Sequence, residues 1–146
     1  MSAGRAAEAV ERLDAITRRL RRDCPWDREQ DARSIVPHTV EEAHELAEAA
    51  ERDDPEAMLD ELGDVLFQVV FLSLLLEERG LGDLGAVAEA CTAKLIRRHP
   101  HVFGPSSNAE SMTSDEVAAQ WEEIKRQERE EREANGEERD ERMPPS

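Results

Sequence analysis

The sequence predicts an all-α protein, a bundle of four to five helices in one domain that covers residues 1–125. Apolar residues recur at spacings of three and four along most of the chain, and no segment shows the sustained alternation that marks a strand. Glycine and proline are sparse, with seven of each among 146 residues. One domain of this length can bury roughly two-thirds of the surface of the extended chain, which is enough for a core.

The first two helices are expected over residues 6–22 and from Pro37 to about Arg52. One face of the first helix is apolar, formed by Val10, Leu13, Ile16 and Leu20. The loop that follows consists of Cys24, Pro25, Trp26 and Asp27. Pro37 and Thr39 open the second helix, whose apolar side consists of Val40, Ala43, Leu46, Ala47 and Ala50.

A third helix is expected from Pro55 to about Arg79. Asp54 provides its N-cap, Pro55 lacks only an N–H that the first turn would leave unpaired, and Gly80 is placed to end it. The second half of this helix is nearly all apolar, so it has to be covered. In a small chain a second copy can supply the cover, and we therefore expect a homodimer built around this helix.

A fourth helix is expected between Asp83 and the His99-Pro100 pair. A fifth follows Thr113, which has capping-box spacing with Glu116. The apolar stripe of this last helix disappears beyond Lys125. Residues 126–146 are almost wholly charged or helix-breaking, so we expect a solvated helix end that frays into a disordered tail.

The charge of the chain excludes several partners. Asp and Glu number 35 against 19 Lys and Arg, and the net charge of −16 would repel nucleic acid and anionic membranes. Cys24 and Cys91 have no metal-binding spacing, which fits a reducing cytoplasm. No apolar stretch has the length of a bilayer span, and no secretory signal precedes the first helix.

Acidic pairs on two neighbouring helices suggest a metal site. Glu42 and Glu45 are three residues apart on the second helix, as are Glu61 and Asp64 on the third, so each pair lies on one face. If the helices run antiparallel through the short Asp53-Asp54 turn, the two pairs can face each other. Four carboxylates so close either protonate or bind a cation.

A ligand set of oxygens without sulfur indicates a hard divalent cation rather than zinc. Mg²⁺ is the expected ion, and Mn²⁺ and Ca²⁺ are alternatives. Mg²⁺ commonly takes substrate phosphates as further ligands, which points to attack on a phosphoanhydride. Gly63 is costly inside a helix, so something must compensate: a close approach by the facing helix, a ligand, or equally well an ordinary packing contact. Spacing alone does not settle the site, because Glu48 and Glu51 have the same spacing in this acidic chain.

Three motifs in order resemble the MazG family and cover roughly residues 8–127. The first is Cys24-Pro25-Trp26-Asp27-Arg28-Glu29-Gln30, the second combines residues 41–45 with residues 61–64 in the form EExxE and ExxD, and the third spans residues 94–104. Trp121-Glu122-Glu123-Ile124-Lys125 is similar to the segment that usually follows. The resemblance implies a hydrolase that cleaves nucleoside triphosphates, NTP or dNTP, between the α and β phosphates. The products are a monophosphate and pyrophosphate, and the enzyme is dimeric or forms a dimer of dimers.

The resemblance also implies roles for individual residues. The metal ligands are Glu42, Glu45, Glu61 and Asp64, and Glu41 beside them either orients the attacking water or has a surface role. Lys94 and Arg98, with Arg97 nearby, match phosphate-contacting residues, although basic side chains near a helix C-terminus are also favoured by the helix dipole. Trp121 matches a position near the base and also fits a core residue, and Trp26 either closes over the site or fills the edge of the core.

Two other classes of protein compete with this interpretation. A ferritin-like di-iron bundle needs two Glu-x-x-His pairs, and the chain supplies only Glu41 with His44. The second is a non-catalytic helical dimer that binds protein partners through the third helix and the acidic tail. The sequence does not choose the base or sugar of a nucleotide substrate, nor between a house-cleaning and a signalling role.

Overall fold

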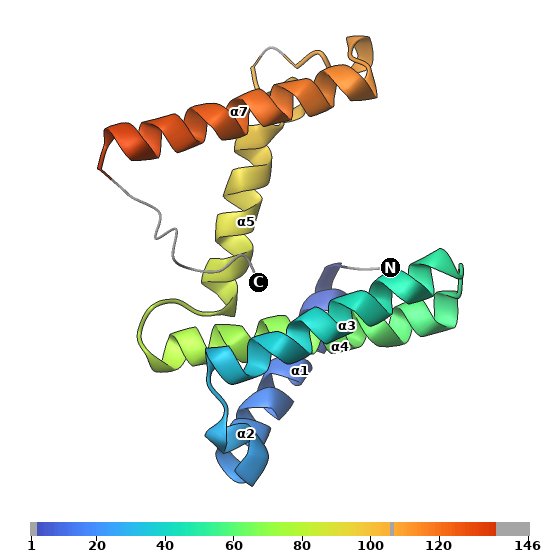
Figure 1. The fold of residues 1–146 in the computed structure, drawn as a ribbon, viewed down its shortest axis with the longest axis vertical. Helices are drawn as coiled ribbons and strands as arrows, with labels where there is room; N and C mark the ends of the chain where they lie inside the picture. Colours follow the sequence, from blue (N-terminus) through green and yellow to red (C-terminus); the bar gives the residue numbers. More distant parts are fainter. Residues whose placement is uncertain (1–2, 106, 137–146) are drawn as a thin grey trace. The chain divides into compact units, whose positions relative to one another are not determined.

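A computed structural model describes residues 3–105 and 107–136, and every regular element in these ranges is helical (Figure 1). The elements are α1 (Ala3–Asp23), α2 (Pro25–Glu29), α3 (Ala32–Glu51), α4 (Pro55–Glu78), α5 (Leu84–Arg98), α6 (Pro100–Phe103), a 3₁₀ turn (Ala109–Ser111) and α7 (Ser114–Ala134). The predicted all-α class is confirmed. Two short helices, α2 and α6, add to the four to five expected. None of the described helices is both long and apolar enough to cross a membrane.

The chain divides into two compact units, one with α1 to α4 and one that begins at Ala88. In the first unit α3 starts at Ala32, earlier than the predicted start at Pro37. Asp31 and Ser34 form a capping box, with the Ser34 N–H donating to Asp31 Oδ1 at 2.9 Å and the Asp31 N–H donating to Ser34 Oγ at 2.8 Å. This cap and the burial of Ile35 offset the backbone hydrogen bond that Pro37 cannot donate.

A tight turn places α3 and α4 side by side and antiparallel (Figure 1). Asp53 has a left-handed backbone with φ of 51°, and the Asp54 carboxylate accepts from the Ala57 N–H at 3.1 Å, which caps α4 as expected. At the other end Gly80 follows the helix with φ of 69°, which glycine adopts without strain. The turn therefore brings the acidic segments of α3 and α4 onto neighbouring helices.

The apolar second half of α4 forms the core of the first unit. Phe71 and Leu75 are buried against Ile35 of α3, and Phe67 and Leu72 pack around them. The first half of α4 remains exposed, with 75% of Leu59 and 50% of Leu62 accessible. The helix is thus covered over part of its length, and the homodimer stays a prediction.

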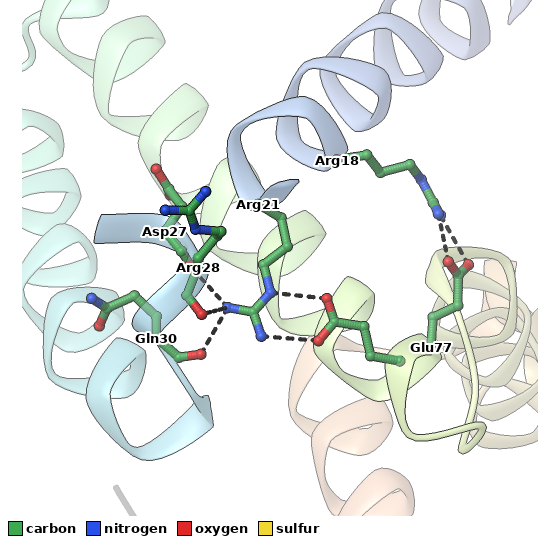
Figure 2. A network of polar contacts seen from close by, with 7 residues as sticks. Arg18, Arg21, Asp27, Arg28, Gln30 and Glu77 are labelled. Carbon is green, nitrogen blue, oxygen red and sulfur yellow. Dashed lines mark hydrogen bonds and ion pairs between the residues drawn. The ribbon is translucent and has the colours of Figure 1, made fainter. Parts of the chain in front are cut away.

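Two arginines attach α1 to the end of α4 (Figure 2). Arg18 forms a bidentate ion pair with Glu77, and Arg21 forms one with Glu78 through two bonds of 2.9 Å. Arg21 Nη1 also donates to three carbonyl oxygens at the end of α2, those of Asp27 at 2.6 Å, Arg28 at 3.1 Å and Gln30 at 2.9 Å. Carbonyls at a helix end are poorly paired within the helix, and that of Asp27 accepts only a long bond of 3.4 Å from the Gln30 N–H. Arg21 therefore provides the donor that these carbonyls need.

In the second unit the capping box of Thr113 and Glu116 starts α7, as predicted. The helix then continues to Ala134, so the solvated helix end expected beyond residue 126 extends at least over residues 126–134. Arg126 forms ion pairs with Glu123 and Glu130 along the surface of the helix, and such pairs stabilise a polar helix. Residues 137–146 lie outside the described residues, and a disordered tail there stays a prediction.

Candidate functional site

Carboxylates from α3 and α4 meet where the two helices lie side by side. Carboxylate oxygens of Glu42, Glu45 and Glu61 lie within 4.8 Å of one another. A second group with the same spread contains Asp60, Glu61 and Asp64, so Glu61 belongs to both. We call Glu42, Glu45, Glu61 and Asp64 the four-carboxylate cluster. The antiparallel arrangement assumed from the sequence is the one that the structure has.

Two oxygens of this cluster are buried without a partner. Glu42 Oε2 and Glu61 Oε2 are inaccessible to solvent and accept no hydrogen bond from the described residues. A buried acceptor that is left unpaired is destabilising, and more so when it carries charge. One oxygen comes from each helix, so a cation between α3 and α4 would compensate both.

The cluster perturbs its own ionisation. Burial, followed by repulsion from Glu45, Asp64 and Glu61, raises the pKa of Glu42 to about 7. Burial also raises the pKa of Glu61, with further contributions from a hydrogen bond to Glu45 and from repulsion by neighbouring carboxylates. Without a cation the cluster therefore holds protons at a pH where isolated glutamates are ionised, and a divalent cation would replace those protons.

The donor set fits a hard divalent cation. It consists of carboxylate oxygens only, which Mg²⁺, Mn²⁺ and Ca²⁺ prefer. Asp60 was missed from the sequence, although its spacing of four from Asp64 puts both on one face of α4. Glu41 is exposed and lies in neither group, so the structure does not bring it to the cluster.

A hollow of about 720 Å³ lies along the first half of α4. Its lining consists of Asp54, Glu56, Ala57, Leu59, Asp60, Gly63 and Asp64. Apart from its chain neighbours and the backbone of its own helix, a Cβ added to Gly63 would meet no described atom within 4 Å, so the facing helix does not approach it closely. The space beside Gly63 is open to a ligand.

The predicted phosphate-contacting residues lie at the end of α5. Lys94 is exposed, whereas Arg97 and Arg98 both bind Glu128 of α7. These hydrogen bonds hold the pKa of Glu128 at about 2. The role of Glu128 cannot be predicted from local spacing, because its two partners are about thirty residues away in the sequence.

Both tryptophans are partly exposed. Trp121 is 38% exposed, with Lys125 Nζ 5.0 Å from its ring centroid and the His99 ring 6.2 Å away. Trp26 is 50% exposed and meets His38 edge to face at 5.7 Å. His38 is one turn before Glu42 on α3, which puts Trp26 near the four-carboxylate cluster.

Comparison with known proteins decides the family. A model described as the MazG nucleotide pyrophosphohydrolase domain matches residues 30–103, which are 74 of the 146 residues. The chain belongs to the MazG family. The matched range contains the four-carboxylate cluster, Lys94, Arg97 and Arg98, while Trp26 and Trp121 lie outside it.

Relatives in the MazG family carry informative names. The chain is 46% identical over 123 residues to a nucleoside triphosphate pyrophosphohydrolase of Escherichia coli, and the match covers 82% of this chain and 46% of that protein. It is 43% identical over 121 residues to the nucleoside triphosphate pyrophosphohydrolase/pyrophosphatase MazG of Thermotoga maritima, covering 82% of this chain and 45% of the relative. The chain thus spans about half the length of these relatives.

A solved structure supports the fold. The crystal structure of a mazG-related protein from Thermotoga maritima matches with a TM-score of 0.64 at 25% sequence identity. The match covers 80% of this chain and 98% of that one, so the two proteins share their fold over nearly the whole length of the Thermotoga maritima protein.

Proposed function

We propose that this protein hydrolyses nucleoside triphosphates, NTP or dNTP, at the α–β phosphoanhydride and releases a nucleoside monophosphate and pyrophosphate. The observation that carries the proposal is the four-carboxylate cluster, with its two buried and unpaired oxygens on facing helices. The names of the relatives in the MazG family supply the reaction class.

In this proposal Glu42, Glu45, Glu61 and Asp64 hold Mg²⁺, for which Mn²⁺ can substitute. When bound, Mg²⁺ would neutralise phosphate charge and lower the pKa of a water molecule that attacks the anhydride. The unpaired oxygens of Glu42 and Glu61 are the direct candidates for ligands. Glu41, which is exposed, would orient the water only after a rearrangement of its side chain.

The basic and aromatic residues would contact the substrate. Lys94, Arg97 and Arg98 offer N–H donors to phosphate oxygens, and arginine matches phosphate geometry well. The exposed ring faces of Trp26 and Trp121 can stack on a base of any kind, which predicts weak selectivity through these residues. We further propose that the protein forms a homodimer in which the second copy covers Leu59 and Leu62 and so shields these exposed apolar side chains from water.

Product analysis tests the reaction. A panel of canonical, deoxy, uracil-containing and oxidised triphosphates is incubated with Mg²⁺, and the products are separated by ion-exchange chromatography. We expect monophosphate and pyrophosphate in equal amounts. Release of diphosphate and orthophosphate instead would refute the proposed cleavage position.

Matched variants test the site. Glu61→Gln keeps the shape of a residue shared by both acidic groups and removes its charge, so the rate should fall by roughly 100-fold or more. Glu48→Gln, on an exposed part of α3, is the control and should keep the wild-type rate. If the two variants have equal activity, or the wild type releases no pyrophosphate from any nucleotide, a non-catalytic helical dimer explains the chain better.

A further inference from the structure

Glu128 joins two arginines at the end of α5. Arg97 Nε donates to Glu128 Oε2 at 2.6 Å, while Arg98 donates to Oε1 through Nη2 at 2.9 Å and Nε at 3.2 Å. The side chains of Glu128 and Arg98 are 15% and 17% exposed, against 54% for Arg97. The contact is therefore partly shielded from water, unlike the other ion pairs of α7.

The pairing leaves most of the donors of both arginines unused. A guanidinium has five N–H groups, of which Glu128 takes one from Arg97 and two from Arg98. Two positive charges share one carboxylate, and Lys94 lies one turn earlier on α5. Glu131 also acts on Arg97, but only through its charge. Lys94, Arg97 and Arg98 thus keep N–H donors and positive charge for an anionic ligand.

Free arginine side chains lose rotamer entropy when they are fixed. An arginine that is already held loses less when a ligand arrives, so a carboxylate that fixes two guanidinium groups can raise the affinity for phosphate. The same carboxylate is negative and repels phosphate. The two effects have opposite signs, and an experiment can separate them.

We propose that Glu128 is a positioning residue that fixes Arg97 and Arg98 for the phosphate groups of the substrate. This inference rests on the phosphate-contacting role of the two arginines in the proposed function. Glu128 itself does not touch the substrate. Its loss therefore weakens phosphate binding, although it removes a negative charge next to the binding groups.

Binding of inorganic tripolyphosphate in the presence of Mg²⁺, measured by calorimetry on the full chain, tests the proposal. We expect Glu128→Gln to lower the affinity by roughly 3- to 10-fold, the size of typical effects of pre-organisation. Glu131→Gln is the matched control for charge, and it should leave the affinity unchanged or raise it slightly. For nucleotide hydrolysis, Glu128→Gln should raise KM by a similar factor with kcat within about twofold of the wild type.

Several results would overturn the proposal. Unchanged or tighter binding by Glu128→Gln would show that the carboxylate only competes with phosphate. An equal loss in Glu131→Gln would show a general effect of charge, and a wild type that does not bind tripolyphosphate would remove the premise. Glu128 would have only a structural role if Glu128→Gln lost helical content and if Glu128→Asp, which keeps the carboxylate, restored none of the affinity. A wild type that binds tripolyphosphate but releases no pyrophosphate contradicts only the proposed function.

Discussion

Replacing Arg21 by methionine should destabilise the first unit far more than the same change at Arg18. Methionine keeps an apolar stem of similar length and removes every hydrogen bond of the guanidinium. Both arginines form ion pairs with α4, yet only Arg21 also serves the end of α2 (Figure 2). Arg21 also lies over the Phe71 ring, 5.8 Å from its centroid, while Arg18 also pairs with Asp14. The comparison therefore tests the bonds to the carbonyl oxygens together with the contact to Phe71.

The magnitude follows from the exposure of these bonds. The carbonyls of Asp27 and Gln30 are partly buried, so water replaces the arginine poorly, while the carbonyl of Arg28 is exposed. Two bonds to a charged donor at about 1.5 kcal/mol each give about 3 kcal/mol. The Arg18 side chain is 41% exposed and that of Glu77 37%, so loss of their ion pair should cost about 1 kcal/mol or less.

Thermal unfolding followed by circular dichroism measures both effects. For a unit that ends at Val87, about 3 kcal/mol corresponds to a fall in Tm of roughly 12–24 °C. Arg18→Met should lower Tm by about 8 °C at most. Equal shifts in the two variants would refute the reasoning, because they would show that the bonds to the end of α2 contribute nothing measurable.

Three further predictions concern the acidic helices. Gly63→Ala should stabilise the metal-free protein by about 1 kcal/mol in urea denaturation, since alanine favours a helix and a Cβ there meets no described atom within 4 Å; a loss of stability would show that the space is filled. Mg²⁺ at 100 times its Kd should stabilise the wild type by about 2.7 kcal/mol, and the same Mg²⁺ concentration should stabilise Glu42→Gln much less. The rise in Tm on addition of Mg²⁺ measures both effects, and an equal rise in the two proteins would show that the metal binds elsewhere. Glu128, whose folded pKa is lowered to about 2, contributes stability that is present above about pH 4.5 and lost as the pH falls toward 2. The difference in unfolding free energy between the wild type and Glu128→Gln should therefore shrink from pH 5 to pH 2, and a constant difference would contradict the ion pair.

Most helices could be predicted because their signals are local. Asp54 with Pro55, Gly80, and Thr113 with Glu116 mark ends of helices that the structure confirms. The start of α3 was placed too late because Pro37 was taken as the start, whereas the capping box of Asp31 and Ser34 begins the helix. A proline near the start of a helix loses one hydrogen bond, and a good cap compensates for it.

The helical class and the two acidic pairs, each on one face of a helix, can be predicted from the sequence, since spacings of three and four act within one helix. The meeting of the two pairs, the addition of Asp60 and the buried, unpaired oxygens of Glu42 and Glu61 depend on how α3 and α4 pack. The tertiary structure also decided that Glu128 holds Arg97 and Arg98. The physical reason is that contacts between helices depend on how their faces pack, and burial, which raises the pKa of Glu42, exists only once the helices are together.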